Sequence, residues 1–173
     1  DPAVSGSSFT ALKTMLLAMG PAQEEELLRR CAGNLDGRQL AGSGEVLSAV
    51  ASGSALVGVT LEETALKRIA AGDDVALIYP SSGTSCVPDA SALIQGAPHP
   101  ENARRFLDFT VSYEVQRLLA EQFCRRSVRK DLPSALMPLE DISLVDYDVE
   151  EASAGRDAVL MTCAFYLGGE EAP

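Results

Sequence analysis

The feature that most constrains the fold is an alternation of short apolar runs with amphipathic stretches. Three runs of strand length, at 55–60, 75–79 and 90–95, consist mainly of small and aliphatic residues. Helical periodicity follows the first run, at 61–71, and the third, from His99 onward. Strands that alternate with helices build layered α/β folds with a largely parallel sheet. The sequence therefore predicts an α/β fold in which a mixed, mostly parallel sheet is flanked by helices.

The expected helices follow from apolar spacing and from their end signals. Leu12, Met15, Leu16 and Met19 have the spacing of one buried face and predict a helix over 8–19, which Gly20-Pro21 ends. Further helices are expected after Pro21, over 45–51, from Pro100 with a break near Ser112, and over 148–165, where Gly155 weakens the last one.

Composition excludes several classes of partner. The net charge of -11 disfavours nucleic-acid backbones and anionic membranes as partners of the whole surface. No apolar run approaches the roughly 20 residues of a spanning helix. The chain carries no signal peptide and begins at Asp1, so we expect a processed chain or a piece of a longer one, whose leader lies outside it.

Four cysteines, Cys31, Cys86, Cys124 and Cys163, stand far apart and lack zinc-site spacing. We expect buried free thiols, because an unpaired Cys is often a small core residue. One or two disulfides are the alternative for an exported protein.

The best candidate site is a run of small hydroxyl residues that leads into the first helix. Ser5, Gly6, Ser7 and Ser8, with Thr10 just inside the helix, could capture an anion on unsatisfied N–H groups at the helix N-terminus. The alternative is an ordinary N-cap, since Ser is a favoured capping residue. A weaker copy of this pattern occurs at Ser43, and the loop at 81–85 could approach a ligand at the end of a strand.

No catalytic set is evident. His99 lies between two prolines and is interpreted as a surface turn residue. Glu62 and Glu63 point apart on a helix, so they do not form a carboxylate pair. The basic cluster at 125–130 is expected to pair with Asp108, Asp131 or Asp141. Neither a nucleophile elbow nor a metal cluster occurs, and an enzyme is therefore the least favoured reading.

Five segments of the chain carry a resemblance when they are taken together: DPAVSGSSFT at 1–10, GSALVGVT at 53–60, YPSSGT at 79–84, GAPHPENARRFLDF at 96–109 and RSVRKD at 126–131. Together they resemble the extracytoplasmic solute-binding proteins of bacterial ABC importers for ferric ion, phosphonates and sugar phosphates. Their order and spacing resemble this family across almost the whole chain, as its C-terminal half.

The resemblance implies a type 2 periplasmic-binding fold with an incomplete two-lobed architecture. It implies that 1–88 is a second-lobe segment with the anion loop, that 89–137 belongs to the first lobe, and that 138–173 returns to the second. The expected ligand residues are Ser5, Gly6, Ser7, Ser8, Thr10, Ser43 and Thr60. Ferric-ion relatives use adjacent tyrosines at positions that are Glu63 and Thr64 here, so a phosphorylated or phosphonate solute fits better.

The resemblance also implies a function. The protein would bind a small anionic solute between two lobes and deliver it to permease subunits, in the periplasm or anchored by lipid at the outer face of the membrane. No cofactor, metal or nucleic acid is expected. The missing N-terminal half, or a second copy of the chain, would cover otherwise exposed apolar surface and strand edges. The alternative function is the small-molecule-sensing effector domain of a transcriptional regulator.

Overall fold

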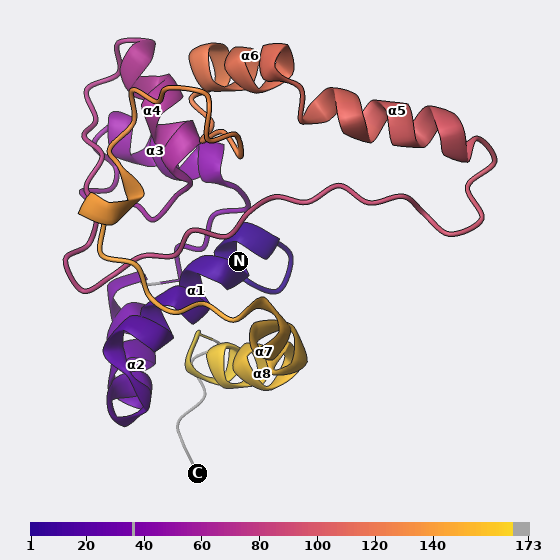
Figure 1. Cartoon of the computed structure of the whole chain (residues 1–173). Helices are drawn as coiled ribbons and strands as arrows, with labels where there is room; N and C mark the ends of the chain where they lie inside the picture. The colour runs from indigo at the N-terminus through magenta and orange to yellow at the C-terminus, as the bar shows by residue number, and fades with distance from the viewer. Residues whose placement is uncertain (36, 168–173) are drawn as a thin grey trace. The chain divides into compact units, whose positions relative to one another are not determined.

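The computed structural model describes residues 1–35 and 37–167, and helices dominate this part of the chain (Figure 1). The α-helices are α1 (Gly6–Met19), α2 (Glu24–Leu35), α3 (Ser43–Ala51), α4 (Glu62–Ala70), α5 (Pro100–Thr110), α6 (Tyr113–Phe123), α7 (Val149–Ala154) and α8 (Arg156–Leu167). Two short 3-10 turns, η1 (Pro21–Gln23) and η2 (Leu139–Asp141), complete the regular structure.

The chain divides into two compact units. The first comprises Asp1–Val87 together with the described residues from Leu139 onward, and the second comprises Pro88–Pro138. The assignment of segments 1–88, 89–137 and 138–173 to particular lobes of the family stays a prediction.

The predicted sheet is wrong for this chain. None of the described residues belongs to a strand; the regular pairing consists of one isolated parallel bridge between Thr84 and Leu144. At this bridge Thr84 N donates to Ser143 O at 2.9 Å, and Val145 N donates to Thr84 O at 2.8 Å. The described residues therefore do not form the α/β, type 2 periplasmic-binding fold that the sequence analysis expected.

The physical reason is that the three apolar runs find no neighbouring strand among the described residues. They have no regular structure, and Leu56 is 95% exposed, Ile78 80% and Ile94 78%. A strand is stabilised by the ladder of a neighbour and by burial of its side chains. The apolar composition of such a run indicates that it tends to be buried. It does not indicate which other segment the run pairs with.

The core of the first unit lies where α1, α2 and α8 pack together. Leu12 and Leu16 of α1, Leu28 of α2 and Cys163 of α8 form its buried cluster. Three of the four residues predicted on the apolar face of the first helix belong to this cluster or pack against it, since Met15 is partly buried there. Met19, the fourth, is 39% exposed at the end of α1.

The last predicted helix is divided into α7 and α8 at Gly155. Asp148 caps α7, because its Oδ1 accepts the N–H of Glu151 at 2.9 Å. Lys13 of α1 pairs with Glu151 at 3.3 Å, which attaches α7 to α1. Glycine is a poor helix former, and here it separates two helices where one weakened helix was expected.

In the second unit, the expected break near Ser112 is confirmed. α5 ends at Thr110 and α6 begins at Tyr113, with Ser112 as its N-cap. Gln116, which is 8% exposed, holds the surrounding chain together: its Nε2 donates to Thr110 O at 2.9 Å. Its Oε1 accepts Ser127 Oγ–H and Val128 N–H, both at 3.1 Å.

Candidate functional site

The predicted anion site lies at the N-terminus of α1, and Ser5 caps this helix. Ser5 has an extended backbone, and its Oγ accepts the N–H of Ser8 at 3.3 Å. The Oγ atoms of Ser5 and Ser7 lie 3.0 Å apart and share a hydrogen bond. The capping interpretation is therefore confirmed, and two hydroxyls lie together beside the cap.

Two backbone amides at this end remain available. Among the contacts of the described residues, the N–H groups of Gly6 and Ser7 donate to no protein acceptor, whereas Ser8 N–H is satisfied by Ser5. Gly6 is exposed, and a Cβ built on it would meet nothing within 4 Å. Free amides at a helix N-terminus attract anions because the helix dipole places partial positive charge there. The geometry offers the amides of Gly6 and Ser7, two of the residues that the sequence placed in the anion site.

Thr10 plays a structural part. Its Oγ1 donates to Gly6 O at 3.1 Å, one turn back along the same helix. That bond occupies the hydroxyl proton, so Thr10 offers no donor at the helix end.

Ser43 and Thr60 are brought together at the start of α3. Thr60 Oγ1 donates to Ser43 O at 3.4 Å. Gly42, and not Ser43, is the N-cap of α3, and it makes no side-chain capping bond. Glu45 lies in the first turn, and its Oε2 accepts Ala41 N–H at 3.1 Å. A carboxylate at this helix start competes with any external anion, so this end of α3 is a poorer anion site than that of α1.

Ser5 and Ser7 belong to one set of hydroxyl residues, and Ser43 and Thr60 belong to another. The first residue of the chain links the segments that carry these two sets. The amino group of Asp1 donates to Leu40 O at 3.2 Å. Among the described residues, no hydrogen bond joins Ser5 or Ser7 directly to Ser43 or Thr60. The seven predicted ligand residues therefore form two local groups in the first unit.

Arg156, the first residue of α8, was missed by the sequence analysis. Its guanidinium lies 5.3 Å from the centroid of the Phe9 ring, which belongs to the first turn of α1. A cation at a helix N-terminus opposes the dipole of its own helix. Arg156 brings α8 into contact with Phe9 of α1.

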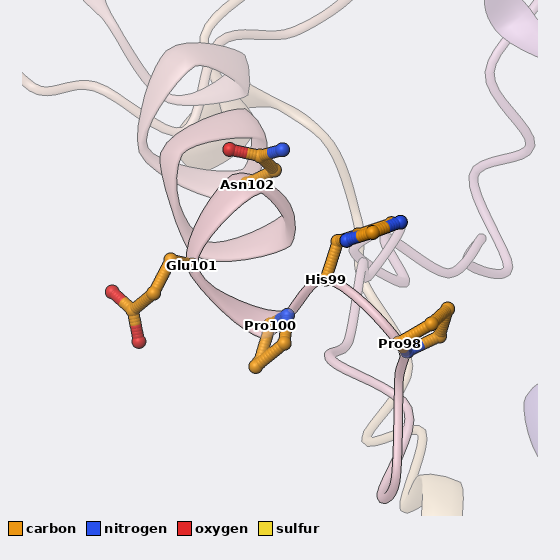
Figure 2. Close-up of a pocket in the computed structure, with 5 residues that line it drawn as sticks. All are labelled: Pro98, His99, Pro100, Glu101 and Asn102. Carbon is orange, nitrogen blue, oxygen red and sulfur yellow. The ribbon is translucent and has the colours of Figure 1, made fainter.

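Two surface hollows are lined by residues outside the predicted ligand set. One, of about 280 Å³, belongs to the first unit and is lined by Asp1, Pro2, Ala3, Gln39, Leu160, Cys163 and Ala164. The other, of about 250 Å³, surrounds the start of α5 and is lined by Pro98, His99, Pro100, Glu101 and Asn102 (Figure 2). His99 is exposed at the N-cap of α5, which confirms its interpretation as a turn residue. Neither hollow is lined by a predicted ligand residue.

The basic cluster at 125–130 forms structural ion pairs. Arg129 pairs with Asp131 at 2.7 Å, as predicted, and Arg125 pairs with Asp89. The hydrogen bond from Arg129 is the main cause that holds the pKa of the Asp131 carboxyl below its usual value, and it raises the pKa of Arg129. These pairs favour the structural interpretation of the cluster over an anion site.

Within the part of the chain that the structure describes, no group of His, Cys, Asp or Glu side chains could hold a metal ion. None of the described helices is long and apolar enough to cross a membrane.

Comparison with known proteins decides the family. Residues 1–125 match the model of a family described as bacterial extracellular solute-binding protein. The chain belongs to this family. The predicted kinship with bacterial extracellular solute-binding proteins is thereby confirmed at the level of the family.

One curated relative of this chain is an uncharacterized protein of Haemophilus influenzae, 29% identical over 161 residues. The match covers 89% of this chain and 45% of that protein, so the chain spans less than half of its relative's length. No solved structure matches the chain at a significant level.

Proposed function

We propose that this protein is the solute-binding component of an ABC importer, which captures a small anionic solute and delivers it to the permease subunits. The observation that carries the proposal is the N-terminus of α1. There, two amides without protein acceptors lie beside two neighbouring hydroxyls in a member of a solute-binding family. The role is that of a binding protein and not of an enzyme.

The solute class follows from this set of donors. Backbone amides and hydroxyls hydrogen-bond the oxygens of phosphate, phosphonate or carboxylate groups, and the helix dipole adds to this attraction. A small anion can bind despite the net charge of -11, since the local donors act at contact distance while distant surface charges are screened. A phosphonate, a sugar phosphate or an iron–anion complex would each present such oxygens.

The proposal also includes a surface on the first unit that contacts another part of the protein or a second copy of the chain. Leu56, Val57 and Ile78 of the first unit are between 80% and 95% exposed, and exposed apolar groups of this kind mark interaction surfaces. We propose that the missing N-terminal half covers them, with a second copy of the chain as the alternative. The mass of the isolated chain in solution tests this: a dimer supports the second copy, and a well-behaved monomer that binds no hydrophobic dye contradicts both.

Gly6→Pro tests the anion site, because it removes one donor and preserves the helix. Gly6 is the first residue of α1, a position that Pro favours, and Ser5 already has the extended backbone (φ -119°, ψ 119°) that precedes Pro. We expect a loss of about 10- to 100-fold in affinity, since a hydrogen bond to a charged group contributes about 1.5–3 kcal/mol. Calorimetric titration of the full-length protein with phosphate, aminoethylphosphonate and hexose phosphates measures it.

Gly6→Ala is the matched control. It keeps the amide, and its Cβ has open space, so affinity should stay within about threefold of the wild type, below the 1.4 kcal/mol of a tenfold change. Equal affinity of the Pro and Ala variants for every anion that the wild type binds would contradict the site.

A further inference from the structure

Two cysteines lie where α2 packs against α8. Cys163 of α8 is only 2% exposed and belongs to the buried cluster with Leu28 of α2. Cys31 follows Leu28 by three residues and Leu27 by four, and Leu27 also packs against the cluster. Residues three and four apart share one face of a helix. Cys31, which is half-buried, therefore lies on the face of α2 that packs on Cys163.

The electrostatics of the two thiols agree with this proximity. Burial raises the pKa of both, and the neighbouring Cys31 raises the pKa of Cys163 further. Because the thiolate is the reacting form, both thiols should react slowly at neutral pH and faster as the pH rises. Cys86 is exposed, and Cys124 belongs to the second unit.

We propose that Cys31 and Cys163 form an intramolecular disulfide after export, which ties α8 to α2. The proposal depends on the extracytoplasmic location of the family, since disulfides persist in oxidising compartments. It goes beyond solute binding and does not require the anion site.

The oxidant is an external disulfide, either of a thiol–disulfide oxidoreductase or of oxidised glutathione. The thiolate of Cys31, the more accessible of the two, attacks this disulfide and releases one external thiol. The thiolate of Cys163 then attacks the sulfur of Cys31 and releases the second. Two electrons pass from the cysteines to the oxidant, and their two protons end on the released thiols.

Among the possible cysteine pairs, an unfolded chain would form the bond between Cys31 and Cys163 least readily. Cys31 and Cys163 are the two cysteines farthest apart in the sequence, whereas Cys86 and Cys124 are the nearest pair. The entropic cost of closing a loop grows with its length, so an unfolded chain forms the shorter loops first. A dominant bond between Cys31 and Cys163 therefore requires the packing of α2 on α8.

The test oxidises the folded wild-type chain and the Cys86→Ser, Cys124→Ser double variant with oxidised glutathione at mildly alkaline pH. Alkylation of remaining thiols and peptide mapping by mass spectrometry then locate the bond. We expect the linked peptides of Cys31 and Cys163 in both proteins, a monomer lighter by two hydrogens, and a melting temperature raised by about 10 °C until reductant is added. In guanidinium, the same bond should become a minor product of the wild type.

Three results would overturn the proposal. One is alkylation of both Cys31 and Cys163 after equilibration with the oxidant, and another is the predominance of bonds to Cys86 or Cys124. The third is the formation of only glutathione adducts or disulfide-linked dimers. If the double variant does not fold, the peptide map of the wild type decides by itself.

Discussion

Replacement of Gln116 by Leu is expected to destabilise the second unit by about 3 kcal/mol. The Gln116 side chain is buried and makes three hydrogen bonds, to Thr110 O, Ser127 Oγ and Val128 N. Leu fills a similar volume but removes all three hydrogen bonds, which are part-buried, and each such bond contributes about 1 kcal/mol. The loss should be concentrated at the junction of α5, α6 and the segment that contains Ser127 and Val128.

Hydrogen exchange followed by mass spectrometry measures this loss locally, which suits a chain of two units. Protection of the peptide that contains Val128 should fall about 100-fold, the equivalent of about 3 kcal/mol. Gln122→Leu is the matched control, because Gln122 belongs to the same helix and is exposed. It should change protection by less than about threefold, since exposed substitutions stay within about 0.5 kcal/mol. Equal effects of the two substitutions would contradict the role of Gln116.

Replacement of Gly83 by Ala is expected to destabilise the first unit by about 2–4 kcal/mol. Gly83 is buried and has a φ of 123°, a region that residues with a Cβ rarely adopt. The added Cβ would also lie 2.8 Å from Cγ1 of Val145. Strain and steric overlap act together here, beside the bridge between Thr84 and Leu144.

Gly53→Ala separates the two causes. Gly53 also has a positive φ, 75°, but a Cβ there meets nothing within 4 Å. Its replacement should cost about 1–2 kcal/mol, the penalty of a left-handed residue alone. Hydrogen exchange of peptides from the first unit measures both variants. Val145→Ala should recover part of the loss in Gly83→Ala, and no recovery would show that the overlap does not contribute.

The helices could be predicted from the sequence because their signals are local. The apolar face of α1, the end of that helix at Gly20 and the break at Ser112 depend on residues within a few positions of one another. Gly155 was recognised as a weak point, but whether a glycine weakens or divides a helix depends on packing. Here Asp148 caps a short α7, and a separate α8 packs on α2.

The sheet could not be predicted correctly because strand pairing is not local. The runs at 55–60 and 75–79 have the composition of buried strands, but each is stabilised as a strand only by a neighbour. In the structure, Gly58 instead approaches α3 closely, where a Cβ would lie 2.4 Å from Cγ1 of Val46. Contact with a helix replaces the ladder at this point.

The helix start that carries the candidate site was predicted correctly, whereas the state of its amides was not. The sequence placed Ser5 and Ser7 at a helix start, because small hydroxyl residues before an apolar stripe mark an N-terminus. Which amides remain free depends on the direction of one side chain: Ser5 Oγ takes Ser8 N–H and leaves those of Gly6 and Ser7. Arg156 lies far from Phe9 in the sequence, so its approach to α1 required the tertiary structure.

Native mass spectrometry of the full-length protein tests the central claim most directly. The protein is measured as purified and after titration with phosphate, aminoethylphosphonate, hexose phosphates and ferric ion. The account predicts a retained or saturable phosphorylated or phosphonate solute whose binding weakens in Gly6→Pro and not in Gly6→Ala. Binding of none of these anions, or of ferric ion alone with equal affinity in both variants, would contradict it.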